Sequence, residues 1–241
     1  MRKIFLLLLS LVVFQSEVEA QLKPYDTSNG ATYGVIGLGS ALTFSSILIG
    51  KDVEPLTIEE INALDPNRIW GIDRYSLRHF SVRADEATDK LLLAAFATPF
   101  LLLLDDPGRN NFGDLSLIVF QGALLNSGLI NLSKVLAKRP RPYNYNPDAP
   151  DDFKTINSAR YSFFSGHAAT SAYFSFTTAK LYNDLYPDSK ARPWVWAGAA
   201  LIPMAVSYGR MRAGRHFFTD VLTGFAVGTA VALLVPELHK N

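Results

Sequence analysis

Cysteine is absent from the 241 residues of this chain. Its absence excludes disulfide bonds and thiolate metal sites, and it is compatible with an oxidising compartment. A large charge of one sign is missing too, because 23 basic residues face 22 acidic ones. No global field therefore indicates a nucleic-acid partner. Repeats, low-complexity tracts and alternating strand patterns are also lacking, so the expected fold class is all-α.

The N-terminus has the pattern of a secretory signal peptide. Met1-Arg2-Lys3 is basic, an apolar run from Ile4 to Phe14 follows, and a short polar segment ends at Val18-Glu19-Ala20. Small residues at the third and last positions before a cut are typical of signal cleavage. We therefore expect residues 1–20 to be a signal peptide and residues 21–241 to form a single helical domain.

Hydrophobic residues make up 49% of the chain and gather into blocks. The six apolar blocks are predicted helices, with a kink at Pro99 in the second; they cover residues 33–50, 91–104, 115–137, 163–182, 193–208 and 219–235. The polar connector 51–90 predicts one or two short surface helices between the first two blocks. We expect a membrane-embedded bundle of about six helices, with a large soluble bundle as the alternative.

The densest group of chemically active residues is the segment Gly209–Asp220, which holds one histidine and three arginines. If a helix already begins near His216, the spacing of four places His216 and Asp220 on one face. The carboxylate would then take the Nδ1 proton and leave Nε2 as a nucleophile or base. The plainer interpretation is a helix cap or a solvated ion pair.

Two further clusters stand beside predicted helix ends. Lys134 lies on the last turn of the block 115–137, and Arg141 lies between two prolines that hold it extended. Ser165-Gly166-His167 precedes the next helix, where free backbone N–H groups bind anions. The neighbouring cations Lys138 and Arg139 are expected only to snorkel at a membrane surface.

The three clusters read K-x6-R-P, then S-G-H, then R-x5-H-x3-D. In this order the chain resembles the type 2 phosphatidic acid phosphatase family, whose superfamily includes bacterial class A acid phosphatases and vanadium haloperoxidases. The likeness covers residues 91–235. Two positions depart from the family pattern: Phe164 replaces the usual proline before S-G-H, and Gly209 replaces the usual serine before Arg210.

The resemblance implies a metal-independent phosphatase that needs no cofactor. His216 would attack phosphorus and form a phosphohistidine, Asp220 would orient its ring, and His167 would act as acid and then as base. The phosphate would be bound by several further groups, as implied by the family motifs: Lys134, Arg141, Ser165, Gly166 and Arg210.

A phosphate site at the mouth of a membrane bundle predicts a phosphorylated lipid as substrate. The family suggests phosphatidate, phosphatidylglycerophosphate, undecaprenyl pyrophosphate or lipid A, and it implies an inner-membrane protein whose site faces the periplasm. That orientation conflicts with a cleaved leader if residues 33–50 span. The alternatives are a vanadium-dependent haloperoxidase, a soluble periplasmic acid phosphatase and a non-enzymatic membrane protein that binds lipid head groups.

Overall fold

The computed structural model describes residues 23–241, so the expected signal peptide lies outside the described part of the chain. Residues 23–241 form helices and short 3₁₀ turns without a β-strand, which confirms the all-α fold class. Six long helices carry the architecture: α2 (Gly30–Gly50), α5 (Val82–Ala97), α7 (Phe112–Ala137), α9 (Gly166–Leu185), α10 (Arg192–Arg212) and α11 (Phe218–Glu237). After Ala97 the chain continues as a 3₁₀ segment, Thr98–Leu104, that contains Pro99, at the predicted kink.

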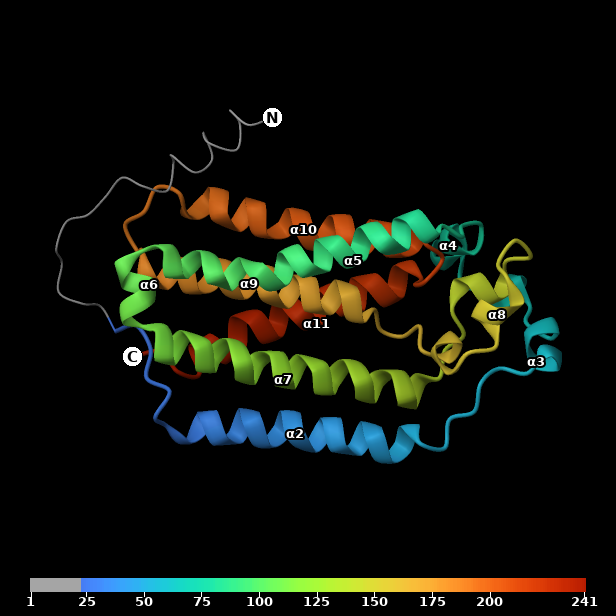
Figure 1. The fold of residues 1–241 in the computed structure, drawn as a ribbon, viewed down its shortest axis with the longest axis horizontal. Helices are drawn as coiled ribbons and strands as arrows, with labels where there is room; N and C mark the ends of the chain where they lie inside the picture. The colour runs from blue at the N-terminus through green and yellow to red at the C-terminus, as the bar shows by residue number, and fades with distance from the viewer. Residues whose placement is uncertain (1–22) are drawn as a thin grey trace.

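The six helices lie side by side, with α9 in the middle of the bundle and α2 on its outer side against α7 (Figure 1). Most residues of α9 are buried, because α5, α7, α10 and α11 surround it. Glycines bring α11 close to α9: a Cβ at Gly228 would lie 2.0 Å from the Ala169 carbonyl oxygen, and one at Gly224 would lie 2.4 Å from that of Ser165. Small residues of this kind let membrane helices approach closely.

Four segments are long and apolar enough to cross a membrane; they are Gly30–Gly50, Val82–Leu104, Phe112–Tyr145 and Phe218–Glu237. Many of their large apolar side chains point away from the protein, including Phe44, Leu93 and Phe120. The chain is therefore a membrane protein, and a soluble bundle is not favoured.

The two ends of the bundle differ. One end holds α6 (Asp106–Asn110) and both ends of the described chain, where Tyr25 pairs with Lys240 (Figure 1). The other end carries three short helices, α3 (Ile58–Asn62), α4 (Arg74–Leu77) and α8 (Asp151–Lys154). The first two are the short helices predicted for the connector.

The predicted start of the second apolar helix, at residue 91, is wrong. Helix α5 begins at Val82, because the Ser81 hydroxyl accepts a hydrogen bond from the Ala84 N–H at 3.2 Å and caps the helix. The polar residues of its first two turns had been assigned to the connector. Their inclusion places Asp85 and Asp89 on the helix, at the end of the bundle that bears the short helices.

Candidate active site

The three motifs meet at the end of the bundle that carries the short helices. The last turn of α7 supplies Lys134, and the loop after α7 supplies Arg141. Helix α9 starts there with Gly166 and His167, and α10 ends there just after Arg210. The following loop carries the buried His216. Residues from four separate segments therefore surround one imidazole.

The ring of His216 is held in one tautomer by the backbone. Its Nδ1 lies 2.7 Å from the carbonyl oxygen of Ser162, which can only accept a hydrogen bond, so Nδ1 carries the proton. The unprotonated Nε2 lies 3.4 Å from Nη1 of Arg141. Burial, followed by the nearby cations, holds the pKa of His216 well below its usual value. The ring is thus neutral, with a lone pair on Nε2.

Asp220 does not take the Nδ1 proton directly, contrary to the sequence prediction. Helix α11 begins at Phe218, so His216 precedes the helix and the spacing of four does not place the two side chains on one helical face. The Asp220 Oδ2 lies 3.8 Å from Nδ1 and instead accepts hydrogen bonds from the Phe217 N–H at 2.9 Å and the Ser162 hydroxyl at 2.5 Å. Asp220 caps α11 and fixes the residue whose carbonyl orients the imidazole.

Arg139 is also placed differently from the prediction. Its guanidinium donates to Asp220 Oδ1 at 2.6 Å and to Asp73 Oδ2 at 2.8 Å, and it lies 4.0 Å from the ring centroid of Phe217. Arg139 is therefore not a snorkelling cation, whereas Lys138 is exposed as expected. Sequence analysis missed Asp73, which sits in the connector without any motif around it.

The site has more cations than carboxylates. Lys134 lies beside the start of α9, since a Cβ at Gly166 would be 3.3 Å from its Nζ. Arg141 is buried, and its Nε donates to the Ser158 carbonyl at 2.7 Å. Within residues 23–241 neither Lys134 nor Arg141 forms an ion pair. Arg210 shares the carboxylate of Asp85 with another arginine, and its buried Nε has no hydrogen-bond acceptor in the described part of the chain.

Helix α9 presents its N-terminus to this cluster. The Ser165 hydroxyl caps the helix by accepting from the Ala168 N–H at 3.4 Å, and the Ser165 N–H donates to the Asp220 carbonyl at 3.0 Å. Both groups of Ser165 are thereby engaged with the protein. The N–H groups of Gly166 and His167 find no acceptor among the described residues. Free N–H groups at a helix N-terminus beside cations are the arrangement that can bind an anion, and we call this group of donors the cradle.

Two carboxylates of α5 complete the site, and sequence analysis missed both. Asp85 accepts from Arg210 and, at 2.5 Å, from Arg215. Asp89 accepts from Nε2 of His167 at 2.8 Å. The sequence feature that could have indicated them is a pair of aspartates four residues apart, which follows the helix-capping Ser81 and precedes an apolar run.

The structure explains the glycine that departs from the family motif. A Cβ at Gly209 would lie 2.4 Å from Cγ2 of Thr88, so α5 leaves no room for a serine there. The Thr88 hydroxyl lies 3.2 Å from Nη1 of Arg210 and provides a hydroxyl next to this arginine. The other departure, Phe164, is buried against Ile130 and Ala169.

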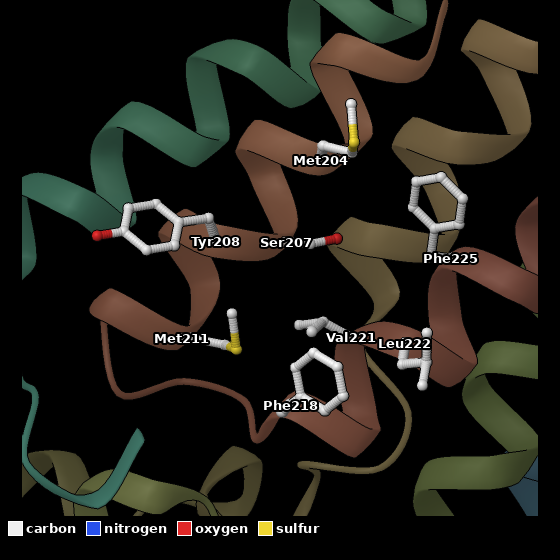
Figure 2. Close-up of a pocket in the computed structure, with 8 residues that line it drawn as sticks. All are labelled: Met204, Ser207, Tyr208, Met211, Phe218, Val221, Leu222 and Phe225. Atoms are coloured by element: carbon white, nitrogen blue, oxygen red, sulfur yellow. The ribbon is translucent and has the colours of Figure 1, made fainter. Parts of the chain in front are cut away.

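An apolar groove of about 180 Å³ lies between α10 and α11 (Figure 2). Two of its residues, Met211 and Phe218, lie one and two positions after Arg210 and His216. The groove therefore begins at the level of the site. Its lining is almost entirely apolar: Met204, Ser207, Tyr208, Met211, Phe218, Val221, Leu222 and Phe225.

Part of the chain is similar in sequence to two curated phosphatases. The chain is 31% identical over 128 residues to a lipid A 4'-phosphatase of Porphyromonas gingivalis, covering 49% of this chain and 50% of that protein. It is 33% identical over 93 residues to a phosphatidylglycerophosphatase B of Bacillus subtilis, covering 38% of this chain and 46% of that protein. The chain thus spans about half the length of the curated relatives it matches.

A solved structure, a transmembrane PAP2 type phosphatidylglycerolphosphate phosphatase from Bacillus subtilis, aligns with a TM-score of 0.42 and 20% identity, over 98% of this chain and 92% of that one. The family model for the PAP2 superfamily matches residues 115–241, which is more than half of the sequence and includes all three motifs. This chain belongs to the PAP2 superfamily.

Proposed function

We propose that this protein is a metal-independent phosphomonoesterase that hydrolyses lipid phosphates through a phosphohistidine on Nε2 of His216. One observation carries the proposal: a neutral imidazole with a free Nε2 stands among cations that outnumber their carboxylate partners. A phosphate dianion supplies the missing negative charge, and arginine forks suit its oxygens. Attack on phosphorus is the reaction that this arrangement favours.

The reaction has two steps. In the first, the bond from Nε2 of His216 to phosphorus forms while the bond to the leaving oxygen breaks, and His167 gives that oxygen a proton. In the second, His167 takes a proton from water as the water oxygen bonds to phosphorus and the P–N bond breaks. Lys134, Arg141 and Arg210 stabilise the charge on the phosphoryl oxygens in both steps.

A lipid is the substrate class that best fits the surroundings of the site. The site lies at the end of a membrane bundle, and the groove of Figure 2 lies between α10 and α11, with Met211 and Phe218 close in sequence to the site residues. The curated relatives are named for lipid A and phosphatidylglycerophosphate. We propose that an acyl chain lies along this groove while the phosphate occupies the cradle.

The groove can be tested by filling it. Ser207→Phe should lower kcat/KM for dioleoyl phosphatidate more than for dibutyryl phosphatidate, because only the long chain needs the groove. Leu201→Phe is the matched control, since Leu201 lies on the same helix, is exposed and does not line the groove. An equal loss for both substrates would show that the groove does not hold the chain.

The decisive experiment measures phosphate release from phosphatidate by the purified protein in detergent, with and without EDTA. The wild type should be active in both conditions, and His216→Ala should be inactive. Brief incubation with [³²P]phosphatidate should label the wild type in an acid-labile, alkali-stable form, as a phosphohistidine does, and should leave the variant unlabelled. Loss of activity on chelation, restored by Mg²⁺, would contradict the proposal.

The same preparation separates the alternatives. Vanadate should inhibit a phosphatase competitively, whereas halide-dependent peroxidase activity on adding vanadate would indicate a haloperoxidase. A protein that only binds lipid head groups would release no phosphate, and that interpretation leaves the arrangement around His216 and His167 without a purpose.

We further propose that the site faces the periplasm from the inner membrane. This proposal takes α2, which is long enough to span, as a crossing helix, so that the end that holds Tyr25 and the end that holds the site lie on opposite sides of the membrane. A periplasmic site therefore places Tyr25 in the cytoplasm. Reporter fusions after Asn146 and after Asn241 should give opposite locations, with the first periplasmic.

A further inference from the structure

We propose that Asp89 of α5 is the positioning residue for the acid–base histidine, His167, an inference that rests on the proposed function. Asp89 is outside the three motifs. Its Oδ1 lies 2.8 Å from Nε2 of His167, across the interface between α5 and α9. A carboxylate can only accept in this contact, so Nε2 carries a proton in either charge state of the ring. Nδ1 is then the atom that exchanges a proton with the substrate.

The groups around His167 explain why it needs such a partner. Arg210 of α10 and Lys134 of α7 are cationic neighbours, and His216 lies on the loop before α11. Burial, followed by Arg210, lowers the pKa of His167 to about 4 even with Asp89, which acts in the opposite direction, in contact with the ring. Cations around the ring reduce the fraction of His167 that is protonated, so a histidine that must donate a proton needs negative charge beside it. Asp89 is the carboxylate in contact with it among the described residues.

Asp89 and the substrate therefore act together on His167. A bound phosphate dianion offsets the charge of the cations, and Asp89 favours the protonated ring and keeps it turned toward the leaving group. When the proton has left Nδ1, the same hydrogen bond keeps the neutral ring in the tautomer whose Nδ1 can accept a proton from water. Asp89 is only partly buried, with 62% of its side chain exposed, so its effect on the ring is moderate.

The contact predicts an effect that depends on the leaving group. An alkoxide leaving group needs a proton, whereas a nitrophenolate leaves without one. We therefore compare dodecyl phosphate with a nitrophenyl phosphate that carries a dodecyl chain, both in the same detergent, and use kcat/KM because it reports the step that expels the leaving group. Asp89→Ala should lower kcat/KM about 10-fold or more for dodecyl phosphate, a part of the roughly 10²–10⁴-fold that acid catalysis contributes. For the nitrophenyl ester it should change little.

The pH profile gives a second readout. Asp89→Asn keeps an acceptor and removes the charge, so the alkaline limb of kcat for dodecyl phosphate should move to lower pH by about half a unit. Asp89→Glu should restore both readouts in large part. Glu86→Gln is the matched control, since Glu86 lies on the same helix, is exposed and has no partner among residues 23–241. It should leave both readouts unchanged.

The outcomes separate the two proposals. A wild type that hydrolyses neither ester refutes the proposed function. An active wild type whose Asp89→Ala variant loses the same factor on both esters, or loses nothing, refutes the positioning role. A selective loss on the alkyl ester together with the shifted alkaline limb supports it.

Discussion

Replacing Arg139 tests the largest difference between the sequence prediction and the structure. The change is Arg139→Gln. Its guanidinium is the cation shared by Asp73 and Asp220, whose side chains are 2% and 0% exposed. Removing one partner of a buried ion pair costs about 3–5 kcal/mol, and because 26% of the arginine side chain is exposed we take the lower end, about 3 kcal/mol. For a chain of this size about 1 kcal/mol lowers Tm by 2–4 °C, so we expect a decrease of roughly 6–12 °C.

The melting temperature can be followed in detergent by the fluorescence of the three tryptophans, while the absence of cysteine rules out thiol-reactive dyes. Lys138→Gln is the matched control, because Lys138 is exposed and forms no ion pair within residues 23–241. Its Tm should equal that of the wild type. Adding Asp73→Asn to Arg139→Gln should recover part of the loss, since one unpaired buried carboxylate is then neutral. If Arg139→Gln has the same Tm as the Lys138→Gln control, the two ion pairs of Arg139 do not exist and its side chain snorkels.

Three further predictions concern the site itself. Arg141→Ala should lower kcat/KM for phosphatidate roughly 10²–10³-fold, as does the loss of one hydrogen-bond donor to a charged transition state. The control Lys138→Ala should keep the wild-type kcat/KM. A loss below about threefold would show that Arg141 does not bind the phosphate. Because the pKa of His216 is lowered, its ring should stay neutral as the pH falls through about 6.5, where an ordinary histidine is half protonated. The ¹⁵N NMR spectrum of the imidazole at pH 6 should show a protonated Nδ1 and an unprotonated Nε2. A titration midpoint of this ring at or above pH 6.5 would contradict the site geometry. Gly209→Ser should destabilise the protein by about 1–3 kcal/mol through overpacking against Thr88. The same substitution should lower the free energy of unfolding less in a Thr88→Ala background. Equal losses in the two backgrounds would show that the two side chains are not in contact.

The sequence by itself determined the class of the fold and the residues of the proposed phosphate site. Apolar blocks of sufficient length with no alternating pattern require helices, and glycines and prolines fix where the blocks end. The three motifs identified His216, His167 and Arg141 because chemically reactive groups in an ordered series of spacings are rarely accidental. The family match to residues 115–241 confirmed the resemblance that the motifs had indicated.

The tertiary structure decided which groups hold those residues in place. Helix α5 brings Asp85 and Asp89 to α9 and α10 across more than 70 residues of sequence, and no motif marks such long-range carboxylates. The backbone carbonyl of Ser162 orients His216, and a carbonyl carries no signal in a sequence because every residue has one. Whether Arg139 snorkels or pairs depends on the position of Asp73, which chain folding alone fixes. Spacing along the chain identifies the residues of a site, while their partners depend on how the helices pack.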